Sequence, residues 1–149
     1  MWSDALLIAE RNHLLRLLLW GAASVIVSTS LFLFMVVTRR SDDRSPLLRH
    51  FAIQLAGWGM VELVVGVWRW QGLVYRDLGS YTSLDRLLWL NVGLDVGYVG
   101  VGVAIAATGW VAARRLGPVG GGLGVVVHGL ALLVLHSMLL SVLARLTVA

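Results

Sequence analysis

The chain has 149 residues, of which 58% are hydrophobic and only 13% are charged, a composition that excludes an ordinary soluble domain and indicates a membrane protein. It contains no cysteine, which excludes disulfides, thiolate metal sites and cysteine nucleophiles. The formal net charge is +4 and all 12 basic residues are arginine, but most flank apolar runs as headgroup anchors do, so no nucleic-acid partner is expected.

The first apolar run covers residues 13–37. It exceeds the roughly 20 residues that cross a hydrocarbon core of about 30 Å. The preceding residues 1–12 carry Asp4 and Glu10 and lack a basic start, which does not fit a cleavable signal peptide. We therefore expect the first run to be retained in the membrane.

Three further apolar runs are each long enough to span, at about 51–74, 87–113 and 119–144. Residues 38–50 and 75–86 are polar and predict loops, while Gly117-Pro118 predicts a helix stop and a tight hairpin. Backbone groups in lipid need internal partners, and no run alternates like a barrel strand. The sequence therefore predicts an all-α fold, a polytopic bundle of four transmembrane helices that forms a single membrane domain over residues 1–149.

Small residues recur every three or four positions in two of the runs. The third run has Gly93, Gly97, Gly100 and Ala104, and the fourth has Gly120 and Gly124. Small side chains let membrane helices approach closely, although glycine is also generally common in such helices. We expect these glycine-rich faces to be contact surfaces within the bundle, with other membrane subunits or in self-association.

The arginines give a weak topology signal. With four spans, both termini lie on one side, and the loops on the other side carry six arginines: Arg39, Arg40, Arg44, Arg49, Arg114 and Arg115. The terminal side has four outside the spans: Arg11, Arg76, Arg86 and Arg145. The positive-inside rule therefore predicts that both termini face away from the cytoplasm.

Polar groups within the second run lie on one stripe. Gln54, Glu62 and Arg69 are separated by eight and seven residues, which places them on one side of a helix. A charge near the bilayer centre costs about 2.5 to 3.5 kcal/mol, so Glu62 should face the interior and have a partner. Arg69, between Trp68 and Trp70, is expected to be an interfacial anchor.

The third run carries the sharpest polar constellation, formed by Asn91, Asp95 and Tyr98. Their separations of four and three residues stack the side chains on one helix face. Asp95 can stay charged by accepting hydrogen bonds from Asn91 and Tyr98, or burial can leave it protonated. The group predicts either a polar clamp between helices or a proton or cation site.

The fourth run contributes His128 and His136, eight residues apart, which a regular helix cannot bring to one metal ion. No metal site is therefore expected. Together with His13 and His50 at the edges of the first two runs, they leave a haem b site as an alternative. The other interpretation is that His128 and His136 are hydrogen-bonded to Asp95, Glu62 or backbone.

Arg16 is the remaining charged residue inside a run. It is predicted either to extend to the headgroups or to pair with Asp95. Catalytic signatures such as HExxH, a Walker loop or GxGxxG after a strand are absent from the sequence, so we expect no enzymatic activity and no cofactor other than the haem considered above.

Three segments carry a family resemblance. They are Gln54-Leu55-Ala56-Gly57-Trp58-Gly59, then Asn91-Val92-Gly93-Leu94-Asp95-Val96-Gly97-Tyr98, and finally Gly122, Gly124, His128 and Gly129. They resemble the Q-x-A-G-W-G, N-x-G-L-D-x-G-Y and G-x-G with H/Q-G elements of a bacterial family of small four-helix membrane proteins of unknown function. The resemblance implies a multi-pass protein of the bacterial inner membrane and groups Gln54, Asn91, Asp95 and Tyr98 in one polar cluster.

Three functions from different classes follow from these patterns. The first is a non-enzymatic accessory or structural subunit that binds a membrane partner, lipid or pigment, because little of the chain lies outside the apolar runs. The second is a small oligomeric proton-coupled transporter or channel that uses Asp95 and Glu62. The third is an electron carrier that binds haem b.

Overall fold

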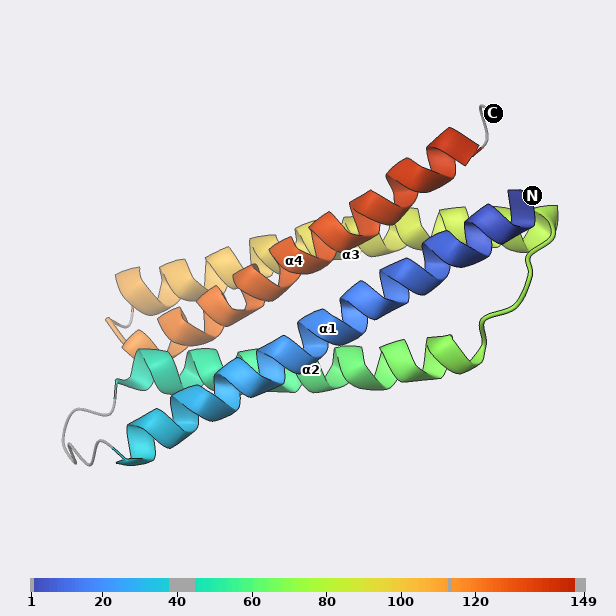
Figure 1. Cartoon of the computed structure of the whole chain (residues 1–149). Coiled ribbons are helices and arrows are strands. Elements are labelled where there is room, and N and C mark those ends of the chain that lie inside the picture. Colours follow the sequence, from blue (N-terminus) through green and yellow to red (C-terminus); the bar gives the residue numbers. More distant parts are fainter. Residues whose placement is uncertain (1, 38–44, 113, 147–149) are drawn as a thin grey trace.

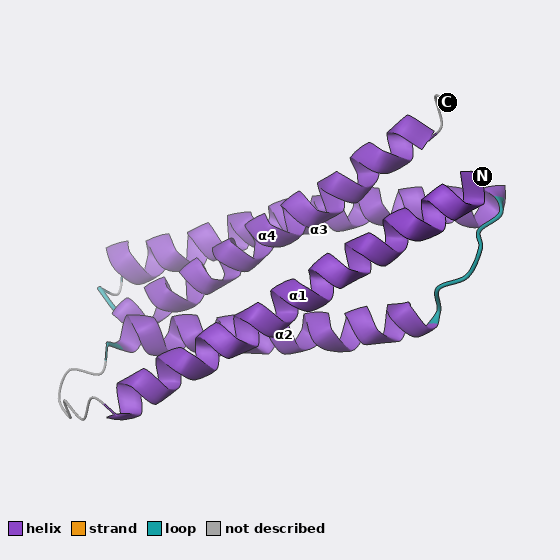
Figure 2. Cartoon of the chain, in the orientation of Figure 1, coloured by secondary structure: helices purple, strands orange, loops and turns teal. Residues whose placement is uncertain are grey.

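A computed structural model describes residues 2–37, 45–112 and 114–146, which fold into four helices (Figure 1). They are α1 (Trp2–Val37), α2 (Pro46–Gln71), α3 (Leu78–Val111) and α4 (Leu116–Leu146). No strand occurs in the described residues (Figure 2). Each helix is long and apolar enough to cross a membrane. The predicted all-α bundle of four helices is confirmed, and the chain has the character of a small membrane protein.

All four helices begin before the apolar runs that predicted them, and the difference is largest for α1 and α3. α1 begins at Trp2 instead of residue 13, and its added turns bury Leu6 and Glu10. α3 begins at Leu78, inside the stretch 75–86 that was predicted to be a loop.

The reason for the early start of α3 is a side-chain cap. The Asp77 carboxylate accepts hydrogen bonds from the Ser80 backbone N–H at 2.8 Å and from the Ser80 hydroxyl at 2.6 Å. Such a cap satisfies a backbone donor that the first helical turn would otherwise leave without a partner. The same hydrogen bonds from Ser80 lower the pKa of Asp77.

Both prolines lie inside the first turns of helices. Pro46 begins α2, and Gly117-Pro118 lies within the first turn of α4. Proline is tolerated there because the first N–H groups of a helix have no intrahelical acceptor. The predicted helix stop at Gly117-Pro118 is therefore wrong, and the connection between α3 and α4 occupies residues 112–115. Within it, Arg114 adopts a left-handed backbone conformation with φ of 46°.

α4 is the central helix, packed against each of the other three, while α1 also packs along α2 (Figure 1). The start of α1, the end of α4 and the connection between α2 and α3 lie at the same end of the bundle. We call this the terminal end. The opposite end carries Arg49, Arg114 and Arg115; the other predicted members of that arginine group, Arg39, Arg40 and Arg44, lie outside the described residues.

Glycines of α4 serve two interfaces. A Cβ added to Gly124 would lie 2.8 Å from Gln54 of α2, and one on Gly120 would meet the Leu47 backbone of the same helix. On the other side, a Cβ on Gly122 would lie 2.5 Å from the Gly102 carbonyl oxygen of α3. The predicted packing role of Gly120 and Gly124 is confirmed.

The glycine face predicted for the third run points away from the other helices. Gly93, Gly97 and Gly100 are exposed, and a Cβ on any of them would have no atom within 4 Å. Instead, Asp95 and Gly102 face α4, because they lie seven residues apart on one stripe of α3. Burial of the Asp95 carboxylate sets the rotation of α3, and this rotation places Gly93 and Gly97, each two residues from Asp95, on the far side.

Leucines fill the remaining interior. At the terminal end one cluster joins α1, α3 and α4, formed by Leu6, Leu84, Leu88, Leu139 and Leu143. A second joins α1 and α4, formed by Leu14, Leu17 and Leu132. These layers surround the polar groups described next.

Candidate functional site

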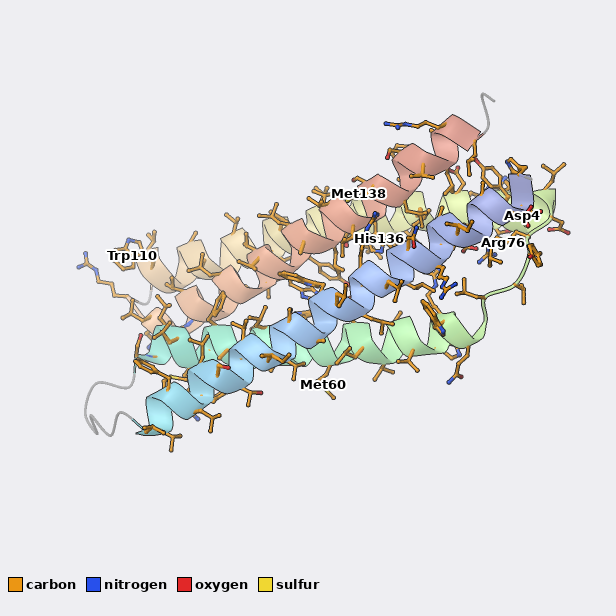
Figure 3. The ribbon with its side chains drawn as sticks, viewed as in Figure 1. Asp4, Met60, Arg76, Trp110, His136 and Met138 are labelled. Atoms are coloured by element: carbon orange, nitrogen blue, oxygen red, sulfur yellow. The ribbon has the colours of Figure 1, made fainter. Side chains whose placement is uncertain are left out.

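The most deeply buried carboxylate of the bundle forms a direct pair with a histidine. Asp95 of α3 is 2% exposed, and its Oδ2 lies 2.7 Å from Nδ1 of His136 on α4. The expectation that a fourth-run histidine meets Asp95 is confirmed. In Figure 3, His136 lies between α4 and α1.

The other members of the predicted third-run cluster do not join this pair. The Tyr98 ring packs against Trp58 of α2 with centroids 5.2 Å apart. Asn91 lines a groove at the surface. The prediction that Asp95 accepts hydrogen bonds from Asn91 and Tyr98 is therefore wrong, since His136 takes their place.

His128 lies between two tryptophans and a second carboxylate. The Trp20 indole N–H points to its Nδ1 at 3.4 Å, and the Trp58 ring stacks on it with centroids 5.4 Å apart. Because indole nitrogen can only donate, Nδ1 accepts and the ring proton belongs on Nε2. That nitrogen faces Oε1 of Glu62 at 3.5 Å, outside hydrogen-bond geometry. The predicted meeting of Glu62 with a fourth-run histidine is confirmed.

His13 is a buried member of the site that the sequence placed at the edge of a span. Its ring is 3% exposed and lies 5.3 Å from the His136 ring, centroid to centroid. Neither ring nitrogen has a hydrogen-bond partner among the described residues. The early start of α1 explains the difference, because it puts three helical turns ahead of His13.

A third acid lies nearer the terminal end. Glu10 of α1 accepts two hydrogen bonds from the Arg76 guanidinium, at 2.7 and 2.8 Å. Figure 3 shows Arg76 at the end of the bundle that carries the N-terminus. A cavity of about 20 Å³, enough for one water molecule, is lined by Glu10, His13, Arg69 and Arg76.

Two residues that were predicted to belong to the site lie apart from these polar pairs. Arg16 is exposed, and no Arg16–Asp95 ion pair forms among the described residues. The proposed bridge is wrong because Asp95 faces α4 and is satisfied there. Gln54 is partly buried against Gly124, so it does not join Asn91, Asp95 and Tyr98 in one cluster.

Each polar pair connects parts of the chain that are distant in sequence. Glu10–Arg76 ties α1 to the connection before α3, Asp95–His136 ties α3 to α4, and Glu62–His128 ties α2 to α4. Paired carboxylates and histidines can hold charge in a low-dielectric interior, and they can also exchange protons. The site can thus act as a set of clamps or as a series of proton acceptors.

The haem alternative depends on how the interior histidines are arranged. His13 and His136 face each other from different helices, with ring centroids 5.3 Å apart and a 41° tilt, so a porphyrin plane would fit between them only after the two rings had separated. For metal ions, no group of three or more histidine, aspartate or glutamate ligands exists in the described part of the chain.

Comparison with known proteins adds a family. Residues 16–137 match the model of a family of unknown function, DUF6992. No curated protein and no solved structure matches the chain. The matched segment includes α2, α3 and the residues of both His–carboxylate pairs. Because this match covers most of the sequence, the chain belongs to DUF6992, and the predicted membership of a family of unknown function is confirmed.

Proposed function

We propose that the protein is a non-enzymatic subunit that binds a partner protein in the bacterial inner membrane through the outward face of α3. The observation that carries the proposal is the stripe of Gly93, Gly97 and Gly100, all exposed and all without a neighbouring atom within 4 Å. Ala104 extends the stripe. In the orientation favoured by the arginines, both termini lie outside the cytoplasm.

A glycine within a helix costs roughly 0.5 to 1 kcal/mol relative to alanine, and the isolated bundle recovers none of this at the three exposed positions. In α4, by contrast, glycines allow backbone contact with α2 and α3. The same use in α3 requires a helix from outside the chain, since membrane helices associate through faces of small residues.

The interior polar groups support this assignment. Glu10, Glu62 and Asp95 each face a basic or histidine partner inside the bundle. These contacts fix how the four helices are rotated, which in turn keeps the glycine stripe pointing outward. The pairs then have a structural role, and the outer surface is where the protein acts, as expected of an accessory subunit of a larger membrane complex.

Native mass spectrometry of protein purified from its own membranes in mild detergent tests the proposal. We expect the wild type to carry a second subunit or to form a defined oligomer, and Gly97→Leu to appear as the monomer. Val64→Leu, on the exposed surface of α2, is the control and should keep the partner. Wild-type protein that is entirely monomeric, or bound only to lipid or pigment in the mass and absorption spectra, would contradict the proposal.

A second candidate function rests on a different observation. The groups His13, His136, Asp95, Glu62 and His128 lie in succession inside the bundle, starting at the water-sized cavity. Groups of this kind at membrane depth are used for proton relays. A proton-coupled transporter would load protons from the terminal end.

Liposomes that contain a pH-sensitive dye separate the two functions. Under an imposed membrane potential, a proton-coupled transporter should acidify the lumen faster than empty liposomes, and either Asp95→Asn or Glu62→Gln should abolish the difference. Asp85→Asn, near the start of α3, is the matched control. We expect wild-type protein to match empty liposomes; a proton flux that depends on Asp95 would instead establish the second function.

A further inference from the structure

A groove opens between the end of α2 and the first half of α3 at the terminal end. Its volume is about 680 Å³, and its walls include both arginines of the water-sized cavity, Arg69 and Arg76. Apolar side chains from both helices, Val65 and Leu87, line it together with Trp68. The backbones of α2 and α3 do not approach each other in the described structure, so the groove opens sideways, toward the bilayer.

The groove has unsatisfied hydrogen-bonding groups. Arg69 is only partly exposed, and its guanidinium forms no hydrogen bond and no ion pair within 4 Å among the described residues, although the charge of Glu10 acts on it. The Asn91 amide on the opposite wall likewise has no hydrogen-bond partner in the described part of the chain. The adjoining cavity contains His13, whose buried ring nitrogens are also without partners. The Arg69 guanidinium and the Asn91 amide can therefore donate hydrogen bonds to a ligand in the groove that carries acceptor atoms.

The charge of the groove specifies the type of ligand. Arg69 and Arg76 contribute two positive charges to the groove. The carboxylate of Glu10, which lines the adjoining cavity, pairs with Arg76. The excess is positive, and arginine binds phosphate oxygens through several N–H groups at once.

From this arrangement we infer that the groove binds an anionic phospholipid, a ligand beyond the protein partner proposed above. Its phosphate lies against Arg69 and the free edge of Arg76, and its acyl chains run along Val65, Leu87 and Trp68. Asn91 donates to a further oxygen of the lipid. The position fits such a molecule, since Trp68 is 73% exposed beside the arginines, as expected of an aromatic residue at the membrane interface.

The test is native mass spectrometry of the full chain in detergent, titrated with dioleoylphosphatidylglycerol or with the zwitterionic dioleoylphosphatidylcholine. We expect one retained phosphatidylglycerol and about tenfold weaker binding in Arg69→Gln, because each tenfold change corresponds to about 1.4 kcal/mol. Arg145→Gln removes the same charge from the exposed end of α4 and should bind like the wild type. Circular dichroism verifies that each variant is folded.

A second variant tests the acyl-chain part of the groove without changing its charge. Val65→Trp fills the groove at a position that is 38% exposed, and we expect it to lose the lipid while both arginines remain. Millimolar inorganic phosphate should not displace the lipid. Equal losses in Arg69→Gln and Arg145→Gln, equal retention of both lipids, unchanged binding in Val65→Trp, or displacement by phosphate would each overturn the inference.

Discussion

Asp95→Ala should lower the free energy of unfolding by about 3 kcal/mol, a value typical of breaking one side of a buried ion pair. The substitution leaves Nδ1 of His136 buried without its 2.7 Å partner. The neighbouring His13 ring packs beside His136 with centroids 5.3 Å apart and forms no hydrogen bond with it. Unfolding of the detergent-solubilised protein, followed by circular dichroism, measures the change.

Two further variants separate the pair from simple packing. Asp95→Asn keeps an acceptor oxygen of nearly the same shape, so it should cost clearly less than Asp95→Ala. In the double variant with His136→Leu, the two losses should not add, because both single changes remove the same contact. Additive losses, or an Asp95→Ala variant as stable as the wild type, would show that the pair does not hold α3 to α4.

Gly122→Ala should destabilise the bundle by about 2 to 3 kcal/mol, the upper part of the range for overpacking a tight interior. Its Cβ would lie 2.5 Å from the Gly102 carbonyl oxygen and 2.6 Å from the Ala106 nitrogen, both in the backbone of α3. Backbone atoms cannot rotate away as a side chain can, so the two helices must separate. Thermal unfolding in detergent should show the loss.

Gly57→Ala is the matched control for this effect. Gly57 is exposed on α2, and a Cβ there would meet no atom within 4 Å. The alanine should be neutral or stabilising, because it improves helix propensity by roughly 0.5 to 1 kcal/mol. Equal destabilisation by both alanines would mean that contact between the α3 and α4 backbones is not the cause.

Several features of the bundle could be predicted from sequence because they depend on local patterns. Hydropathy over windows of about 20 residues identifies four spans. Burying a charge in the membrane is costly, so Glu62 and Asp95 each need a polar partner. The histidines of the fourth run lie at comparable depth and are the nearest candidates. The structure confirms both contacts, Glu62 with His128 and Asp95 with His136.

The rotation of α3 could not be predicted in the same way. This helix carries glycines on more than one side, and spacing alone does not say which side meets α4. Gly93 and Gly97 have the regular four-residue separation of a membrane packing motif, yet the inward stripe is formed by Asp95, Gly102 and Gly109. The polar residue was the better guide, because burying its carboxylate outweighs the packing of a small side chain.

Long-range pairs explain the remaining errors. Glu10 and Arg76 are 66 residues apart, and each alone looks like a polar residue outside the membrane. Their contact ties the start of α1 to the connection between α2 and α3, beside the small cavity that His13 also lines. Trp20 and Trp58 around His128 left only a weak signal, namely tryptophans deep within spans instead of near their ends.

If the interior pairs hold the bundle together, the glycine face of α3 is left to bind a partner. The most direct measurement is photo-crosslinking in the protein's own membranes, with benzophenone maleimide attached to Gly97→Cys or, as control, Val64→Cys; the native sequence contains no cysteine to interfere. A discrete protein adduct from Gly97→Cys, identified by mass spectrometry and absent from Val64→Cys, is the predicted result. Adducts with lipid alone at both positions would contradict the claim.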